Sequence, residues 1–147
     1  MKIVKNIAIV AFAASFMFAG VGFHMANNYT DMDADVAIAT SYGVTYDLNG
    51  QTSVGWDSNM GMMMYFAAPA GTSLRLGWVA AVEDDAGTVD VDETAAAKTS
   101  VGLGFTWWTG GDGLNTSIST SYDMVTTEAV DGNTTDGNLS VSVGFGF

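Results

Sequence analysis

Few residues in this chain of 147 could carry acid–base or nucleophilic chemistry. It has a single histidine, His24, and no cysteine. His24 lies beside the apolar N-terminal segment, and the sequence suggests no Ser-His-Asp or Cys-His arrangement around it. We therefore expect that the protein is not an enzyme and that it needs no cofactor.

Two acidic segments carry the oxygen-rich side chains that Ca²⁺ prefers. In the first, residues 31–35, aspartates alternate as in a calcium-binding loop, but the glycine and the closing glutamate of such a loop are missing. The second segment supplies weak candidates at Asp84, Asp85, Asp90 and Asp92. Solvated acidic loops explain both segments better, so we predict no metal site.

A third feature is a set of charges that share a face with small residues. The set comprises Asp47, Asp57, Arg75, Glu83 and Asp123. An unpaired guanidinium in a low-dielectric interior is costly, so we expect Arg75 to meet Asp57 or Asp123. In a water-filled interior, Arg75 would be solvated instead.

These charges lie in segments where large apolar residues alternate with small ones, a pattern that predicts strands. Eighteen glycines against one proline are typical of strands joined by turns. The predicted strands cover residues 21–26, 36–48, 52–57, 62–68, 73–83, 100–108, 114–124 and 138–147. This predicts an all-β, antiparallel up-and-down chain of eight strands. A six-strand alternative loses the first segment and merges the third with the fourth.

The expected connections differ in length. Short turns are predicted at Asn49-Gly50, at 69–72 and at 110–113, and the first suits a two-residue hairpin. Longer polar links are predicted at 27–33, 84–94 and 126–137, whereas 57–61 is short and breaks the alternation. Short turns would therefore gather at one end of the sheet.

The bulky apolar face of the predicted strands fits two environments, lipid or a buried core in water. In lipid it would face outward from a closed barrel whose small polar face lines the interior. In water it would instead be buried between the sheets of a secreted sandwich. We predict the transmembrane β-barrel, because the strands nearly lack the lysines and arginines with which soluble sheets block edge pairing. Inward glycines would leave room for water in a barrel, and the glycines assigned inward are Gly22, Gly43, Gly55, Gly77, Gly102, Gly104, Gly144 and Gly146.

The N-terminal residues 1–20 have the pattern of a secretory signal peptide. Two lysines precede an apolar run from residue 7 to 18, and small residues follow. Cleavage is expected after Ala19, Gly20 or Gly22, which leaves residues 21–147 as one domain. A membrane-anchoring helix is the alternative, although the apolar run is short for a span.

The last strand ends on an aromatic residue. Its outward side chains are Leu139, Val141, Val143, Phe145 and Phe147. This ending resembles the C-terminal signature of Gram-negative outer-membrane β-barrels, which the barrel-assembly machinery recognises. The whole mature length resembles small eight-stranded barrels. Residues 102–107, 121–125 and the last strand also resemble porins of the alphaproteobacterial type.

The resemblance implies an outer-membrane location, with contacts to lipid and lipopolysaccharide. Divalent ions could bridge the acidic loops to lipopolysaccharide phosphates. Tyr46, Trp56, Trp78 and Trp107 lie toward strand ends, as an interfacial aromatic girdle requires. Porins close with about 16 strands, more than this chain supplies, so porin-like closure would need a homo-oligomer or a narrow monomer.

Charge limits the partners and suggests a function. The chain has 16 acidic and 4 basic residues, and two of the basic ones lie in the expected signal peptide. Such a surface repels nucleic acid, which we exclude as a partner. We expect passive permeation of small solutes with a preference for cations. The alternative is a closed structural or adhesive barrel that displays acidic loops.

Overall fold

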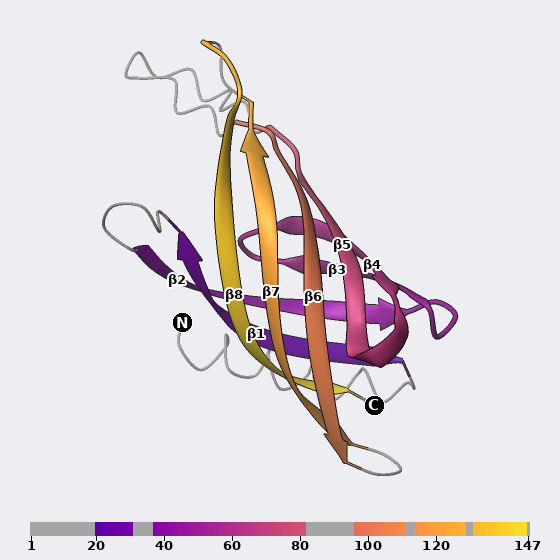
Figure 1. Ribbon diagram of the computed structural model, residues 1–147. Coiled ribbons are helices and arrows are strands. Elements are labelled where there is room, and N and C mark those ends of the chain that lie inside the picture. Colours follow the sequence, from indigo (N-terminus) through magenta and orange to yellow (C-terminus); the bar gives the residue numbers. More distant parts are fainter. Residues whose placement is uncertain (1–19, 31–36, 82–95, 111–113, 129–130, 147) are drawn as a thin grey trace, which may run out of the picture.

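The computed structural model describes residues 20–30, 37–81, 96–110, 114–128 and 131–146. These residues form a closed barrel of eight antiparallel strands in sequence order (Figure 1). The elements are β1 (Val21–Thr30), β2 (Ala37–Asp47), β3 (Thr52–Asp57), β4 (Gly61–Ala67), the 3₁₀ turn η1 (Pro69–Gly71), β5 (Thr72–Val79), β6 (Lys98–Gly110), β7 (Asn115–Thr127) and β8 (Thr134–Gly146). The predicted fold class is confirmed.

Closure comes from the pairing of the first strand with the last. β1 and β8 pair from Gly22 opposite Gly146 to Tyr29 opposite Leu139. Because β1 belongs to the sheet and β3 and β4 are separate strands, the six-strand alternative is wrong. A closed sheet also rules out the two-sheet sandwich.

Some predicted boundaries are wrong. Residues 27–30, expected in a turn, extend β1, while residues 126–127 and 134–137, expected in a loop, extend β7 and β8. These extensions are polar, so they lack the apolar alternation that marks the other strands. They are nevertheless held by ladder pairing and, in one case, by a 3.0 Å hydrogen bond between the hydroxyls of Thr126 and Thr135.

The β2–β3 connection also differs from the expected two-residue hairpin. The amide of Leu48 donates to the carbonyl of Thr52, which leaves a three-residue loop between them. The carboxylate of Asp47 accepts hydrogen bonds from the amides of Asn49 and Gly50, and Gly50 takes a φ of 75°. Side-chain capping of these amides therefore favours the wider loop.

The barrel wall is uneven in height. β6, β7 and β8 have 13 residues each, whereas β3 has 6 and β4 has 7. Figure 1 shows the β3–β4 hairpin ending well below the tips of β7 and β8. The described chain ends, Gly20 and Gly146, lie at the end of the barrel where β2 meets β3, β4 meets β5 and β6 meets β7. We call this the short-turn end, and the other the loop end.

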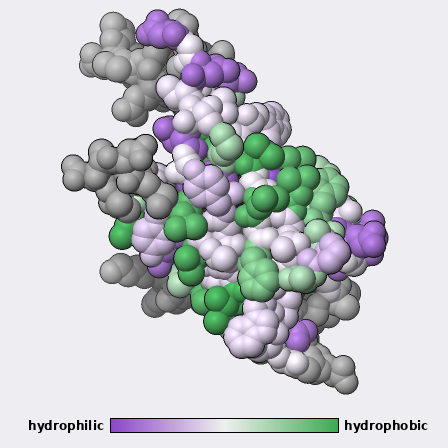
Figure 2. Space-filling view, viewed as in Figure 1, coloured by the Kyte–Doolittle hydropathy of each residue, from purple (hydrophilic) through white to green (hydrophobic). Residues whose placement is uncertain are grey.

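Large apolar side chains are exposed on the outside of the barrel, and Figure 2 shows one face on which many of them gather. Exposed examples on the outward positions of six strands are Met25, Ile38, Met62, Leu76, Leu103, Ile118 and Tyr122. The bulky face is therefore the exterior, and the small polar face lines the interior. Within the described residues, no helix is long and apolar enough to cross a membrane.

Candidate functional site in the barrel interior

Two rows of inward residues, each spanning three neighbouring strands, carry the charge of the interior. In the first, His24 of β1 lies opposite Gly43 of β2, which lies opposite Asp57 of β3. The imidazole of His24 covers Gly43, where a Cβ atom would collide with it, and its Nε2 reaches Asp57 Oδ2 at 2.9 Å. The glycine therefore lets the base reach its acid across the intervening strand.

The second row repeats this layout on the other side of the barrel. Arg75 of β5 lies opposite Gly102 of β6, which lies opposite Asp123 of β7. The carboxylate of Asp123 lies over Gly102, and its Oδ1 is 3.4 Å from Arg75 Nε. Of the two acids expected to meet Arg75, the partner is Asp123.

Asp57 is held by hydrogen bonds on both carboxylate oxygens. Oδ1 accepts from the amides of Asn59 and Met60, at 2.8 and 3.0 Å. Oδ2 accepts from the hydroxyl of Ser41 at 3.0 Å and is the atom that faces His24. One side chain thus ties the β3–β4 turn to β1 and β2.

From Ser41 the hydrogen bonds continue across β1 to β8. Asn28 Nδ2 donates to Ser41 Oγ at 2.9 Å, and Asn28 Oδ1 accepts from Ser140 at 2.7 Å and from Asn138 Nδ2 at 3.4 Å. Asn28, Ser41, Ser140 and Asn138 are all buried. The interior at this level is a polar network, as buried amides and hydroxyls require.

Asp123 has fewer partners. Its Oδ2 accepts from the Ser121 hydroxyl at 3.1 Å, and Nη1 of the Arg75 guanidinium also donates to that hydroxyl. The guanidinium carbon lies 5.6 Å from the centre of the Tyr65 ring, within cation–π range. Asp123 is 0% exposed, and neither its Oδ1 nor Arg75 Nε makes a hydrogen bond. Charge is therefore the main link between this acid and its base.

Two methionines complete the closure of the lumen. Met63 of β4 is 1% exposed and lies between Gly55 and Gly77, with its sulfur against Gly77. Met60, in the β3–β4 turn, is 6% exposed, and its sulfur lies 3.8 Å from Asn138 Nδ2. The expectation that inward glycines leave room for water is therefore wrong at Gly43, Gly77 and Gly102, where neighbouring side chains fill the space.

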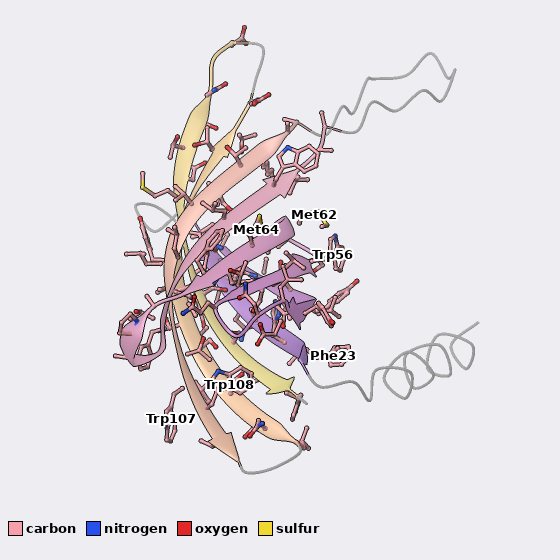
Figure 3. All side chains as sticks on the ribbon, turned by 90° about the vertical axis from the view of Figure 1, so that its right-hand side faces the viewer. Phe23, Trp56, Met62, Met64, Trp107 and Trp108 are labelled. Carbon is pink, nitrogen blue, oxygen red and sulfur yellow. The ribbon has the colours of Figure 1, made fainter. Side chains whose placement is uncertain are left out.

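That expectation holds toward the short-turn end, where a cavity of about 280 Å³ lies. We call it the vestibule. Its lining includes Gly22 and Gly104, many hydroxyls, and the side chains His24, Tyr65 and Arg75. Trp108 also lines it, with its ring against Gly146, whereas Trp107 points away from the wall (Figure 3).

Of the remaining predicted charged sites, the structure describes Asp47 and not the others. Asp47 is exposed and caps the β2–β3 loop rather than lining the closed interior. Glu83, Phe147, the acidic segment at 31–35 and the calcium candidates at 84, 85, 90 and 92 lie outside the described residues. In the part of the chain that is described, no cluster of His, Asp and Glu could hold a metal.

The predicted girdle residues are all exposed on the outer face. Tyr46 and Trp107 lie near the short-turn end of their strands, and Trp56 and Trp78 near the other end. The ring of Trp56 meets that of Tyr42 edge-on, with centroids 6.1 Å apart. Residues 139, 141, 143 and 145 of the terminal strand also point outward, because their neighbours 140, 142, 144 and 146 line the interior.

Sequence reasoning missed the pairing of His24 with Asp57. His24 falls on the small face of its segment, which was the available signal that it points inward. Its acid lies 33 residues away, and Ser41 donates to that acid rather than contacting the imidazole. The arrangement is therefore not a nucleophile–base pair, which would need the hydroxyl on the imidazole.

The fold and interior define a class: a closed eight-stranded barrel with an apolar exterior, a polar constriction and a vestibule at one end. No family model, curated protein or solved structure matches the chain.

Proposed function

We propose that the chain is an outer-membrane β-barrel protein, exported by its N-terminal segment and embedded through the apolar outer face. The observation that carries this proposal is the continuous outward display of large apolar side chains on a closed sheet. In water, exposed apolar area of this extent would drive association. In a bilayer, a closed barrel leaves no strand edge unpaired, and the lipid chains solvate its apolar outer surface.

Under the same proposal, the resting barrel is closed and its role is structural or adhesive. Buried side chains from β1, β2, β3, β4, β7 and β8 occupy the lumen between the vestibule and the loop end. An eight-stranded barrel has an interior just wide enough for side chains to fill it. The acidic loops would then be the part offered to the exterior, with lipid, lipopolysaccharide and the assembly machinery as partners.

Cation permeation is the second candidate, and the vestibule is the observation that favours it. A hydroxyl-lined cavity already covers part of the path. Within the described constriction, Asp57 and Asp123 outnumber the single fixed cation Arg75, so cations would be preferred if the path opened.

Lipid embedding can be tested by placing an arginine on the outer face at two different depths in the membrane. Leu103, midway along β6, is 69% exposed, and Leu114, at the short-turn end, is 54% exposed. In lipid, Leu103→Arg should cost about 2–4 kcal/mol of folding free energy, and Leu114→Arg about 0–1 kcal/mol. The measurement is urea-dependent folding into liposomes, read by heat-modifiable gel mobility. Equal folding of the two variants, or a wild type that stays soluble without detergent, would contradict the proposal.

A further inference from the structure

The β3–β4 hairpin is unlike the other hairpins of the barrel. Its turn lies at the loop end, yet only three residues join its strands, and both strands are short. Ser58 continues the ladder with β2, since its amide donates to Tyr42 O at 2.9 Å and its hydroxyl accepts from the Tyr42 amide at 3.1 Å. The turn is therefore fixed to the wall at its start. Asn59, which follows, is exposed, whereas the Met60 side chain is buried in the lumen.

Three buried side chains of this hairpin point into the lumen. Asp57, Met60 and Met63 are at most 6% exposed. Met60 reaches Asn138 of β8, and Met63 lies against Gly77 of β5. We call residues 57–63 the plug segment. The Met60 side chain crosses the lumen to β8, whereas the Met63 side chain fills the space beside the neighbouring strand β5.

The plug segment separates two spaces. On one side lies the vestibule, into which His24 is exposed. On the other side lies a cavity of about 10 Å³, lined by Met60, Asn59 and wall residues that include Lys98 and Ser100 near the loop end. Asp57 connects the vestibule with the turn beside the smaller cavity, because one of its oxygens faces His24 and the other accepts hydrogen bonds from the amides of residues 59 and 60.

The contacts between the plug segment and the opposite wall are weak. Met60 meets Asn138 through a sulfur, which is a poor acceptor, and Asn138 Oδ1 makes no hydrogen bond. Methionine is unbranched and has three rotatable bonds, so Met60 can swing away from β8, and Met63 from Gly77 of the neighbouring strand, without breaking the strand ladder. The wall is therefore compatible with an open lumen.

We propose that the plug segment is a movable gate, and that swinging Met60 and Met63 aside opens the barrel to small monovalent cations. The proposal rests on the proposed membrane function and goes beyond its closed resting state. Once the methionines withdraw, Asp57 and Asp123 line the narrow part of the opening against Arg75, while Lys98 lies nearer the loop end, so the narrow part attracts cations. The carboxylate of Asp57 holds the turn in its closed position, through the hydrogen bonds it accepts from the amides of Asn59 and Met60.

The test compares two pairs of methionines on the same hairpin. Met60→Ala/Met63→Ala removes the inward sulfurs, whereas Met62→Ala/Met64→Ala removes the outward ones, which are exposed. In planar bilayers, the inward variant should pass at least roughly tenfold more current than wild type, with a cation-selective reversal potential in a salt gradient. The outward variant should match wild type.

Heat-modifiable gel mobility shows, before recording, that each variant is folded. If the inward pair does not fold, the single variant Met60→Ala takes its place and should also conduct above the outward control. A folded inward variant as silent as the control would overturn the gate and leave the membrane barrel standing. An anion-selective current would also overturn it, since Arg75 rather than the two aspartates would then dominate the path.

Discussion

The two charged rows of the interior have the same layout but are held in different ways. In the row of His24, Gly43 and Asp57, the acid accepts four hydrogen bonds, two of them from backbone amides. In the row of Arg75, Gly102 and Asp123, the acid accepts one hydrogen bond from Ser121 and otherwise faces the charge of Arg75. An acid held by hydrogen bonds should tolerate the loss of its base, whereas an acid held by charge should not.

The largest expected effect is that of Arg75→Gln. The substitution leaves Asp123, which is 0% exposed, without the cation beside it. Breaking a buried ion pair from one side costs about 3–5 kcal/mol, because the remaining charge is uncompensated. We expect a loss of this size in the free energy of unfolding, measured by urea titration in detergent micelles.

A double variant is the control for this prediction. Arg75→Gln/Asp123→Asn removes both charges and should recover most of the lost stability, since no buried charge then remains in that row. If Arg75→Gln alone costs less than about 1 kcal/mol, as a surface pair would, the carboxylate of Asp123 is reached by solvent and the contrast between the rows fails.

The next largest expected effect is that of Gly102→Ala, because Gly102 leaves the space in which the Asp123 carboxylate lies. Gly104→Ala is the matched control. A methyl group at Gly102 would collide with the Asp123 carboxylate and with the backbone carbonyl of Tyr122, which cannot move independently. A methyl group at Gly104 meets only side-chain atoms of Ser73, Arg75 and Ser121, at 2.9, 3.1 and 3.7 Å. Gly102→Ala should therefore cost about 1–3 kcal/mol and Gly104→Ala less than about 1 kcal/mol.

Thermal unfolding by gel mobility ranks these two variants without assuming reversibility. The prediction requires Gly102→Ala to lose its heat-modifiable form at a lower temperature than Gly104→Ala. The opposite order would mean that the Arg75 row does not need the space above Gly102 that the Asp123 carboxylate occupies.

The fold was predictable from the sequence because alternation with a period of two is a local signal. Val141, Val143 and Phe145 identify one apolar face of their strand without reference to any other strand. The polar ends of β7 and β8 carry no such signal, since Thr126 and Thr135 are stabilised by each other across the ladder. Those ends were therefore expected to be loop.

The interior was less predictable because it depends on register between strands. His24 meets Asp57 only if Gly43 lies between them, and a slip of one residue would turn one side chain to the outside. Loop composition does not fix that register. For the same reason, the sequence could not distinguish Gly43, which is covered by an imidazole, from Gly104, which lines the vestibule.

The smallest expected effect is that of His24→Gln, which tests whether Asp57 is held by hydrogen bonds rather than by the charge of its base. Glutamine is of similar size and carries an N–H donor that can reach Asp57 Oδ2, while Ser41 and the two turn amides keep their bonds to the carboxylate. The exchange of one hydrogen bond for a poorer one should cost about 1 kcal/mol or less in the free energy of unfolding. The measurement is the urea titration used for Arg75→Gln, so that the two losses can be compared directly. A loss for His24→Gln as large as that for Arg75→Gln would show that Asp57 also depends on charge, and the hydrogen bonds from the turn would then not be enough to hold it.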